Sequence, residues 1–169
     1  MSMLQQTGAG PMRTAPPRTD GMVGAVAEDA AEVFLTLTVA DQLCGVPVLA
    51  VRDVLGAQAI TRIPLAPPEV AGSLNLRGRI VTAVDLRRRL GLAARPPGEA
   101  GMSVVVEREA ELYSLLVDQV GDVVPLPRAD RAANPPTLDP LWRAVAVGVH
   151  RLGDRLVILL DVERVLEIG

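Results

Sequence analysis

The chain has 169 residues, a formal net charge of −3 and aromatic side chains at only 2% of positions. Every basic residue is arginine, and Cys44 and His150 are the only residues of their types, which excludes lysine Schiff-base chemistry, an internal disulfide and a zinc site with four His or Cys ligands. We therefore expect no cofactor and no metal, and the single cysteine, which gives no sign of an oxidising compartment, predicts a cytoplasmic protein. The acidic balance argues against a nucleic-acid partner, and the lack of a long apolar run argues against membrane insertion.

The first 31 residues differ in composition from the rest of the chain. They are rich in Gly, Pro, Ala and Thr and show no hydrophobic periodicity, so they bury too little apolar surface to offset the entropy of ordering. We expect residues 1–31 to form a flexible N-terminal tail and residues 32–169 to form the folded domain.

Strand patterns begin directly after this tail. Leu35, Leu37 and Val39 alternate with Thr36 and Thr38, which is the period of a half-buried strand, and residues 43–46 add a second strand. Residues 48–55 fit either a short helix or a bent strand. The prolines within residues 63–68 predict a rigid, exposed connection, because proline lacks the amide donor that a helix or central strand needs.

A hairpin and a short helix follow this connection. Residues 74–81 form two apolar arms around Gly78, which tolerates a positive φ. Asp85 comes after the second arm and is placed to cap a short helix over residues 86–90, which Gly91 ends.

The second half of the chain repeats these patterns. It contains predicted strands at 102–106, 112–117, 120–126 and 156–160, a proline-rich loop at 134–140, and a helix at 162–168 after Asp161. Residues 76–90 share identities with residues 152–166, and residues 43–54 share identities with residues 112–123, in the same order along the chain. These matches indicate a duplicated unit of about 70 residues.

Short strands in two similar units, separated by Gly and Pro turns, predict an all-β fold made of two small barrels. Short helices are expected after Asp85 and Asp161. Barrel closure would remove exposed strand edges, which matters in a sequence so rich in valine and leucine.

Four acidic residues are the first candidates for chemistry. Asp85 and Asp161 would form a carboxylate pair in an enzyme if the fold brought them together. Each, however, stands between a strand and a short helix, where a helix N-cap is expected. Asp118 and Asp122 could share a divalent cation, but two carboxylates without further oxygen donors do not make a cation site. We expect these two residues to form turns.

The single histidine and cysteine add no catalytic constellation. No nucleophile motif accompanies His150. Cys44 lies in an apolar strand, where we expect a buried and inert thiol.

The arginines are more informative. We expect Arg87, Arg88 and Arg89, on the short helix, to form a solvated face. A rival hypothesis makes the arginine-rich stretch 77–95 a nucleic-acid-binding surface. Arg77 differs from the others, because the hairpin tip holds its guanidinium outward, in a position that suits a carboxylate on another protein.

Several segments form an ordered pattern: Val51-Arg52-Asp53-Val54, 60–64, Gly72-Ser73-Leu74-Asn75-Leu76-Arg77-Gly78-Arg79-Ile80-Val81, 84–87, 115–123 and 153–161. From about residue 33 to residue 166, this pattern resembles the CheW family, the coupling proteins of bacterial chemotaxis arrays. The resemblance implies two five-stranded SH3-like barrels that form one CheW-like module.

The resemblance also implies a non-catalytic adaptor. Family members bridge the cytoplasmic tips of chemoreceptors to the regulatory domain of the histidine kinase CheA. The family's functional arginine falls on Arg77, and the acidic position of its strand segment falls on Asp53. We carry both over as partner-binding residues, with Val51, Asn75 and Gly78 as neighbouring contacts.

The chain departs from the family pattern at three places. Cys44 stands where members usually carry an aromatic residue, Thr82-Ala83 replaces a common Pro-Val pair, and Asp53 is one methylene shorter than the usual glutamate. Two alternatives stay open: an adaptor of another chemosensory pathway, such as twitching motility, and an enzyme that uses Asp85 and Asp161.

Overall fold

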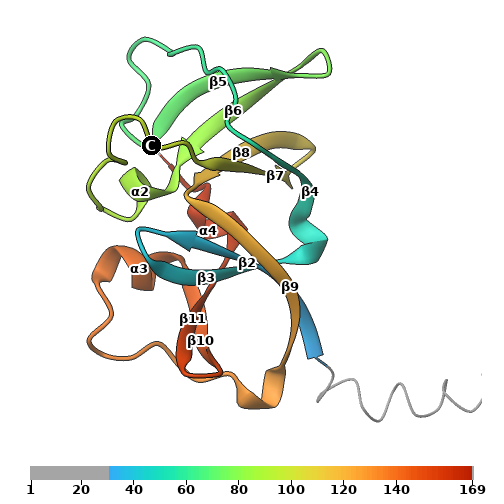
Figure 1. Ribbon diagram of the computed structural model, residues 1–169, viewed down its shortest axis with the longest axis vertical. Helices are drawn as coiled ribbons and strands as arrows, with labels where there is room; N and C mark the ends of the chain where they lie inside the picture. Colours follow the sequence, from blue (N-terminus) through green and yellow to red (C-terminus); the bar gives the residue numbers. More distant parts are fainter. Residues whose placement is uncertain (1–30, 169) are drawn as a thin grey trace, which may run out of the picture.

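The computed structural model describes residues 31–168, so the predicted tail lies outside the described residues except for Ala31, which begins the first strand. The described chain forms two five-stranded sheets that lie one above the other, with short helices beside them (Figure 1). This confirms the predicted all-β class. No helix within residues 31–168 has the length and apolar character needed to cross a bilayer.

The first sheet has the strand order β10-β11-β3-β2-β9, and the second has the order β4-β7-β8-β6-β5. The strands of the first sheet are β2 (Ala31–Val39), β3 (Gln42–Pro47), β9 (Gln119–Pro127), β10 (Ala146–Leu152) and β11 (Arg155–Leu160). Those of the second are β4 (Val51–Leu55), β5 (Val70–Leu76), β6 (Arg79–Asp85), β7 (Met102–Arg108) and β8 (Glu111–Val117). The helical segments are α2 (Leu86–Arg89), α3 (Pro140–Val145), α4 (Val162–Val165) and the 3₁₀ turns η2 (Val48–Ala50) and η3 (Arg128–Asp130).

The two sheets repeat the same topology and the same register. In the first sheet the parallel pair β11 and β3 aligns Ile158 with Cys44. In the second sheet the parallel pair β6 and β8 aligns Thr82 with Tyr113. Thr82 corresponds to Ile158 in one pair of matching sequence blocks, and Cys44 corresponds to Tyr113 in the other. Equivalent residues therefore occupy equivalent positions in the two sheets, which confirms the predicted duplication.

The repeats do not correspond one to one with the sheets. The chain leaves the first sheet after β3 and enters the second at β4, and it returns from β8 to β9 (Figure 1). We call these connections the β3–β4 crossing (Val48–Ala50) and the β8–β9 crossing (Asp118). Each sheet therefore contains strands from both repeats, an exchange that internal sequence similarity does not reveal.

Each sheet curls so that its edges approach one another. An isolated backbone bridge joins Thr61, which follows β4, to Ser73 on β5, and an equivalent bridge joins Ala132 to Val149. Gly148 permits the second approach, because a Cβ there would lie 2.8 Å from the carbonyl oxygen of Ala132. Complete closure of each sheet into a barrel stays a prediction.

Three local features differ from the sequence-based expectations or resolve them. Residues 48–55 form a 3₁₀ turn followed by a strand, which settles the open alternative. The last helix ends at Val165 rather than continuing to residue 168, because Arg89 binds the carbonyl oxygens that a further turn would use. The helix α3 and the strand β10 were not predicted from the sequence, although Asp139 followed by Pro140 is a typical helix start.

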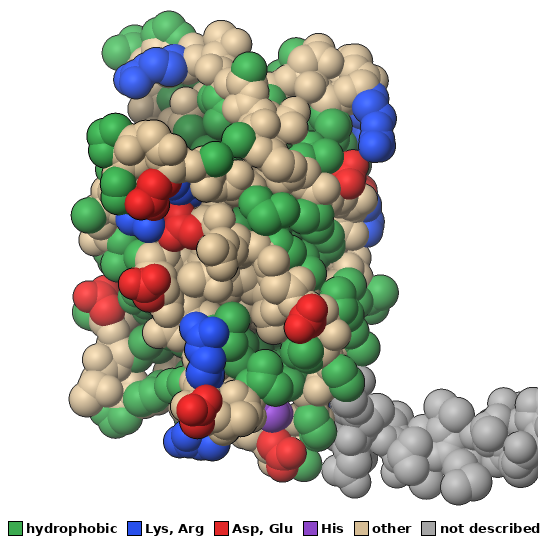
Figure 2. Space-filling view, viewed as in Figure 1, with side chains coloured by type: hydrophobic (Ala, Val, Ile, Leu, Met, Phe, Trp, Pro, Cys, Tyr) green, Lys and Arg blue, Asp and Glu red, His purple; other side chains and the backbone are tan. Residues whose placement is uncertain are grey.

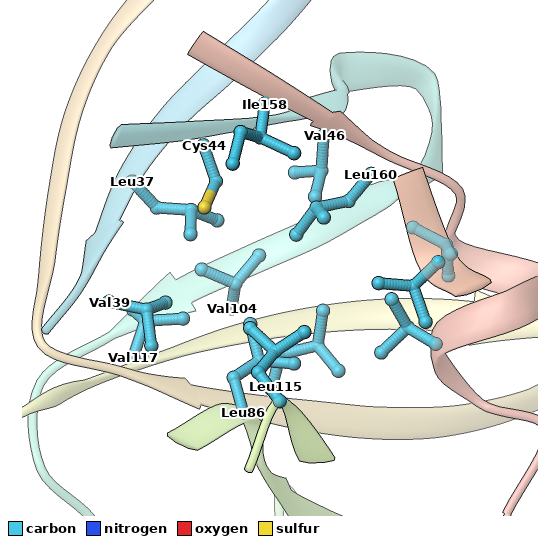
Figure 3. Packing of buried hydrophobic residues seen from close by; sticks show 14 of the residues in the cluster. Leu37, Val39, Cys44, Val46, Leu86, Val104, Leu115, Val117, Ile158 and Leu160 are labelled. Carbon is cyan, nitrogen blue, oxygen red and sulfur yellow. The ribbon is translucent and has the colours of Figure 1, made fainter. Parts of the chain in front are cut away.

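The largest apolar cluster lies between the two sheets (Figure 3). Smaller clusters occupy the opposite face of each sheet. The inter-sheet cluster combines side chains from both sheets and all three helices, including Leu37, Val39, Cys44, Val46, Leu86, Val104, Leu115, Val117, Trp142, Ile158, Leu160 and Val165. The other two clusters are built on Phe34, Leu43, Leu126, Val157 and Leu159, and on Leu74, Val81 and Ala83. Most of the buried apolar surface is therefore shared by both sheets.

A half-buried charge cluster fixes the β8–β9 crossing. The carboxylate of Asp118 accepts hydrogen bonds from the amide of Ala40 at 2.6 Å, from Arg87 at 2.8 Å and from Arg95 at 2.9 Å. Burial alone would raise the pKa of Asp118, but these hydrogen bonds together hold the pKa below its ordinary value of 3.8. Asp118 thus joins the turn after β2 to α2 and the loop that follows it.

The expected solvated face of α2 is therefore wrong for two of its three arginines. Arg87 is only 14% exposed and is paired with Asp118. Arg89 donates to the carbonyl oxygens of Val165 and Arg164 at 3.0 Å. Only Arg88 is exposed, because tertiary contacts supply partners for the other two.

We expect Leu115→Ala to destabilise both sheets together. Leu115 is fully buried in the shared cluster, so its truncation should lower the free energy of unfolding by about 2 to 5 kcal/mol. Urea unfolding followed by the fluorescence of Trp142, beside the first sheet, and by the near-ultraviolet signal of Tyr113, on the second, should give one coincident transition. Ile80→Ala, at a 73% exposed position, is the control. Separate transitions for the two probes would contradict the shared core.

We expect Asp118→Asn to lower the free energy of unfolding by about 3 kcal/mol at neutral pH, because it leaves two arginines without their carboxylate. A carboxyl group whose pKa is depressed on folding stabilises the folded state above its ordinary pKa, and loses this contribution as the pH falls through the folded value. The difference between wild type and variant should thus be constant above about pH 5 and shrink below the ordinary value of 3.8. Urea titrations at several pH values measure it, and a difference that grows in acid would contradict the assignment.

Candidate partner-binding site

The tip of the β5–β6 hairpin is a two-residue turn. Arg77 and Gly78 both have positive φ, at 52° and 84°, which is the pattern of a type I′ turn. The side-chain oxygen of Asn75 accepts a hydrogen bond from the amide of Gly78 at 2.9 Å. Since Arg77 adopts a left-handed conformation that costs free energy for a residue with a Cβ, this hydrogen bond helps to hold the turn.

Arg77 projects from this tip and forms an ion pair with Asp53. The Arg77 side chain is 79% exposed, that of Asp53 is 26% exposed, and their closest atoms are 3.3 Å apart. Asp53 lies on β4, which is at the opposite edge of the second sheet from β5. The curl of the sheet thus brings together the two residues that the family resemblance singled out.

Figure 2 shows this corner of the molecule. Basic and acidic side chains lie against one another at its right-hand edge, where Figure 1 places β4 and the tip of the β5–β6 hairpin. The ion pair therefore lies on the surface, where another protein can reach it.

A change of register on β4 turns Asp53 toward the hairpin. Val51 aligns with Val106 and Asp53 aligns with Val105, so one residue is added between them. Val51 is partly buried against the shared core, whereas the Asp53 carboxylate accepts from the amide of Val54 at 2.9 Å. Val51 therefore packs β4 against the shared core, and its contact with a partner stays a prediction.

The ion pair is weakly held. Exposed pairs of this kind contribute about 0 to 1 kcal/mol to stability, because water screens the charges. Arg77 can therefore exchange Asp53 for a carboxylate of another protein without loss of the fold. A guanidinium offers several donors in one plane, so it can also contact both carboxylates at once.

An exposed apolar residue beside Asn75 was not predicted from the sequence. Ile80, on β6, is 73% exposed, although it was assigned to an apolar arm of the hairpin. The alternation of side chains along β6 could have predicted this exposure, because Val81 and Ala83 are buried on one face and Ile80 lies on the other. The tip therefore presents an exposed aliphatic side chain together with charge.

The other candidate residues have structural roles. Asp85 accepts from the amide of Arg87 at 3.0 Å and Asp161 from that of Glu163 at 2.9 Å, which confirms both helix caps. Cys44 is fully buried, and burial raises the pKa of its thiol to about 12, as expected for an inert cysteine. Within residues 31–168, no group of three or more His, Cys, Asp or Glu side chains is placed to hold a metal ion.

Comparisons with known proteins agree with this architecture. A family model described as "CheW-like domain" matches residues 33–168. The chain is 31% identical over 132 residues to a chemotaxis protein CheW of Rhizobium meliloti, a match that covers 78% of this chain and 85% of the relative. It is 30% identical over 139 residues to a chemotaxis protein CheW of Klebsiella aerogenes, covering 82% and 84% of the two chains.

A solved structure is similar over the same region. The crystal structure of the scaffolding protein TtCheW from Thermoanaerobacter tengcongensis superimposes with a TM-score of 0.73 at 27% identity, covering 82% of this chain and 94% of that chain. Sequence and structure both match over almost the entire described region, and the chain therefore belongs to the family of proteins with a CheW-like domain.

Proposed function

We propose that this protein is a non-catalytic adaptor that couples chemoreceptors to the histidine kinase CheA in bacterial chemotaxis. Relatives that match most of the chain are described as chemotaxis proteins, and the similar solved structure is described as a scaffolding protein. The observation that carries the proposal is the ion pair between Arg77, 79% exposed at the tip of the β5–β6 hairpin, and Asp53 on β4.

The finer assignment names the surfaces of the two partners. We infer that the regulatory domain of CheA and the cytoplasmic tip of a chemoreceptor bind this protein, in the cytoplasm beside a receptor array. Arg77, Asp53, Asn75, Gly78 and Val51 are the proposed contact region. A side chain of either partner that carries a carboxylate would bind Arg77 in place of Asp53.

Such an adaptor works through differences in binding free energy. It transmits a signal only if its contacts with one partner differ between the states of the other. A weak internal ion pair suits this role, because the same arginine can be shared between an internal and an external carboxylate. This mechanism requires no reactive side chain, which fits a chain whose thiol is buried and whose helix-capping aspartates are already hydrogen-bonded.

We expect Arg77→Glu to weaken binding of the CheA regulatory domain or of a soluble chemoreceptor tip by about 10-fold or more, because it replaces a charge-assisted hydrogen bond with repulsion. Isothermal titration calorimetry against each partner from the same genome measures the loss. The melting temperature should stay within about 2 °C of wild type, since an exposed ion pair stabilises little.

Arg155→Glu is the matched control. Arg155 is also an exposed arginine at the start of a strand, β11 in the first sheet, and it lies outside the proposed contact region. Its reversal should leave both affinities unchanged. Equal affinities of wild type and Arg77→Glu for both partners would overturn the assignment of Arg77.

We expect Asn75 to act by positioning Arg77. Asn75→Ala removes the acceptor for the Gly78 amide and should weaken binding several-fold, through a turn that no longer holds the guanidinium in place. Asn75→Asp keeps an oxygen acceptor and should retain most of the affinity. The same calorimetric titration separates the variants, and a greater loss for Asn75→Asp than for Asn75→Ala would instead indicate a direct contact of the amide nitrogen.

A further inference from the structure

The two crossings between the sheets occupy equivalent positions in the duplication, but they are held very differently. Residues 43–54 correspond to residues 112–123, so Leu49 in the β3–β4 crossing is the equivalent of Asp118 in the β8–β9 crossing. One position carries a paired charge that is 17% exposed, and the other carries an aliphatic side chain that is 86% exposed.

The β8–β9 crossing is fixed to both sheets. The amide of Asp118 donates to the carbonyl oxygen of Thr38, on β2 of the first sheet, at 3.0 Å. The carboxylate of Asp118 accepts from the amide of Ala40, in the turn that follows β2. Arg87 and Arg95 bind the same carboxylate from the side of the second sheet, and Arg95 also donates to the carbonyl oxygen of Val117 at 3.0 Å. Charged hydrogen bonds in a half-buried site are strong and little screened by salt.

The β3–β4 crossing has no such charge cluster, and it is held by partly buried packing of Ala50 against the shared core. The 3₁₀ turn Val48–Ala50 contains no buried residue and no side-chain cap. Its side-chain hydrogen bond comes from Arg52, which is 49% exposed and donates to the Leu49 carbonyl oxygen at 3.1 Å. A groove of about 350 Å³, lined in part by Pro47, Ala50 and Glu107, opens beside the turn. Exposed hydrogen bonds and sparse burial are the properties of segments that open at low free energy.

We propose that the two sheets pivot about the β8–β9 crossing, and that the β3–β4 crossing is the compliant connection through which a partner bound at Arg77 and Asp53 shifts one sheet against the other. This regulation rests on the proposed function. The binding site and the compliant connection are close along the chain, because β4 begins directly after the 3₁₀ turn and carries Asp53. A small displacement at one end of a fixed pivot becomes a rotation of packed layers, as in other shear and hinge transitions.

The pivot can be tested in the free protein by the distance between two spin labels, one on each sheet. Cysteines introduced by Glu111→Cys on β8 and Arg151→Cys on β10, both exposed positions, would carry the labels, since the only native thiol, Cys44, is buried with a pKa raised to about 12. Double electron–electron resonance on the otherwise native chain should give one narrow distance distribution. Asp118→Asn should broaden that distribution at least twofold.

Asp122→Asn is the matched control. Asp122 lies four residues from Asp118 and is exposed, so the same change of charge there should leave the distribution as in wild type. Arg95→Gln removes one of the bonds to Asp118 and should broaden the distribution less, and it keeps the test available if Asp118→Asn does not fold. A width unchanged in every folded variant of the Asp118 cluster would overturn the pivot.

The partner adds a second measurement. A saturating concentration of the CheA regulatory domain should shift the mean distance in the wild type, and the shift should be lost in Arg77→Glu at a concentration that still saturates binding. A bound wild-type complex with an unshifted distance would overturn the coupling. Unchanged affinity in Arg77→Glu would instead count against the proposed site, while the widths in the free protein still decide the pivot.

Discussion

The apolar cluster between the two sheets is the interaction on which the rest of the structure depends. The clusters on the opposite face of each sheet are small, so most of the apolar burial that offsets the entropy of ordering the strands is shared between the sheets. The strand exchange reinforces this dependence, because β2 and β3 of the first repeat pair with β9 and β11 of the second, and β7 and β8 of the second repeat pair with β4 and β6 of the first. The hairpin that carries Arg77 joins this core through Val84, and its other buried residues, Leu74, Val81 and Ala83, pack in the smaller cluster of the second sheet.

Arginine side chains form hydrogen bonds and ion pairs at the edge of this core. A guanidinium has five donors in a fixed plane, so one side chain can satisfy several acceptors that a lysine would leave unpaired. Arg89 binds carbonyl oxygens at the end of α4, and Arg108 binds both Glu163 and the carbonyl oxygen of Leu166. The absence of lysine thus accompanies a fold that uses arginine for capping and bridging, whereas the Arg77 side chain is 79% exposed and pairs only with Asp53 among the described residues.

Local patterns predicted what local physics determines. Alternation along residues 35–39 predicted β2, and the carboxylates of Asp85 and Asp161 predicted two helix starts, because a strand period and an N-cap depend on neighbouring residues alone. The Asp118 cluster was not predictable in this way, since its partners lie 78, 31 and 23 residues away. The same holds for the contact of Asp53 with Arg77, which requires the sheet to curl; the family resemblance named both residues but not their pairing.

The site lies where the two repeats diverge. Identical residues of the matching blocks, such as Asp85 and Asp161, serve the common scaffold. The hairpin tips differ: the position of Arg77 in the first repeat is occupied by Gly153 in the second, and that of Gly78 by Asp154. The equivalent of Asp53 is Asp122, so the second repeat retains the carboxylate and lacks the arginine at its tip. Duplication thus supplied two copies of one scaffold, and a change at a single turn gave one of them a cationic side chain that both an internal and an external carboxylate can bind.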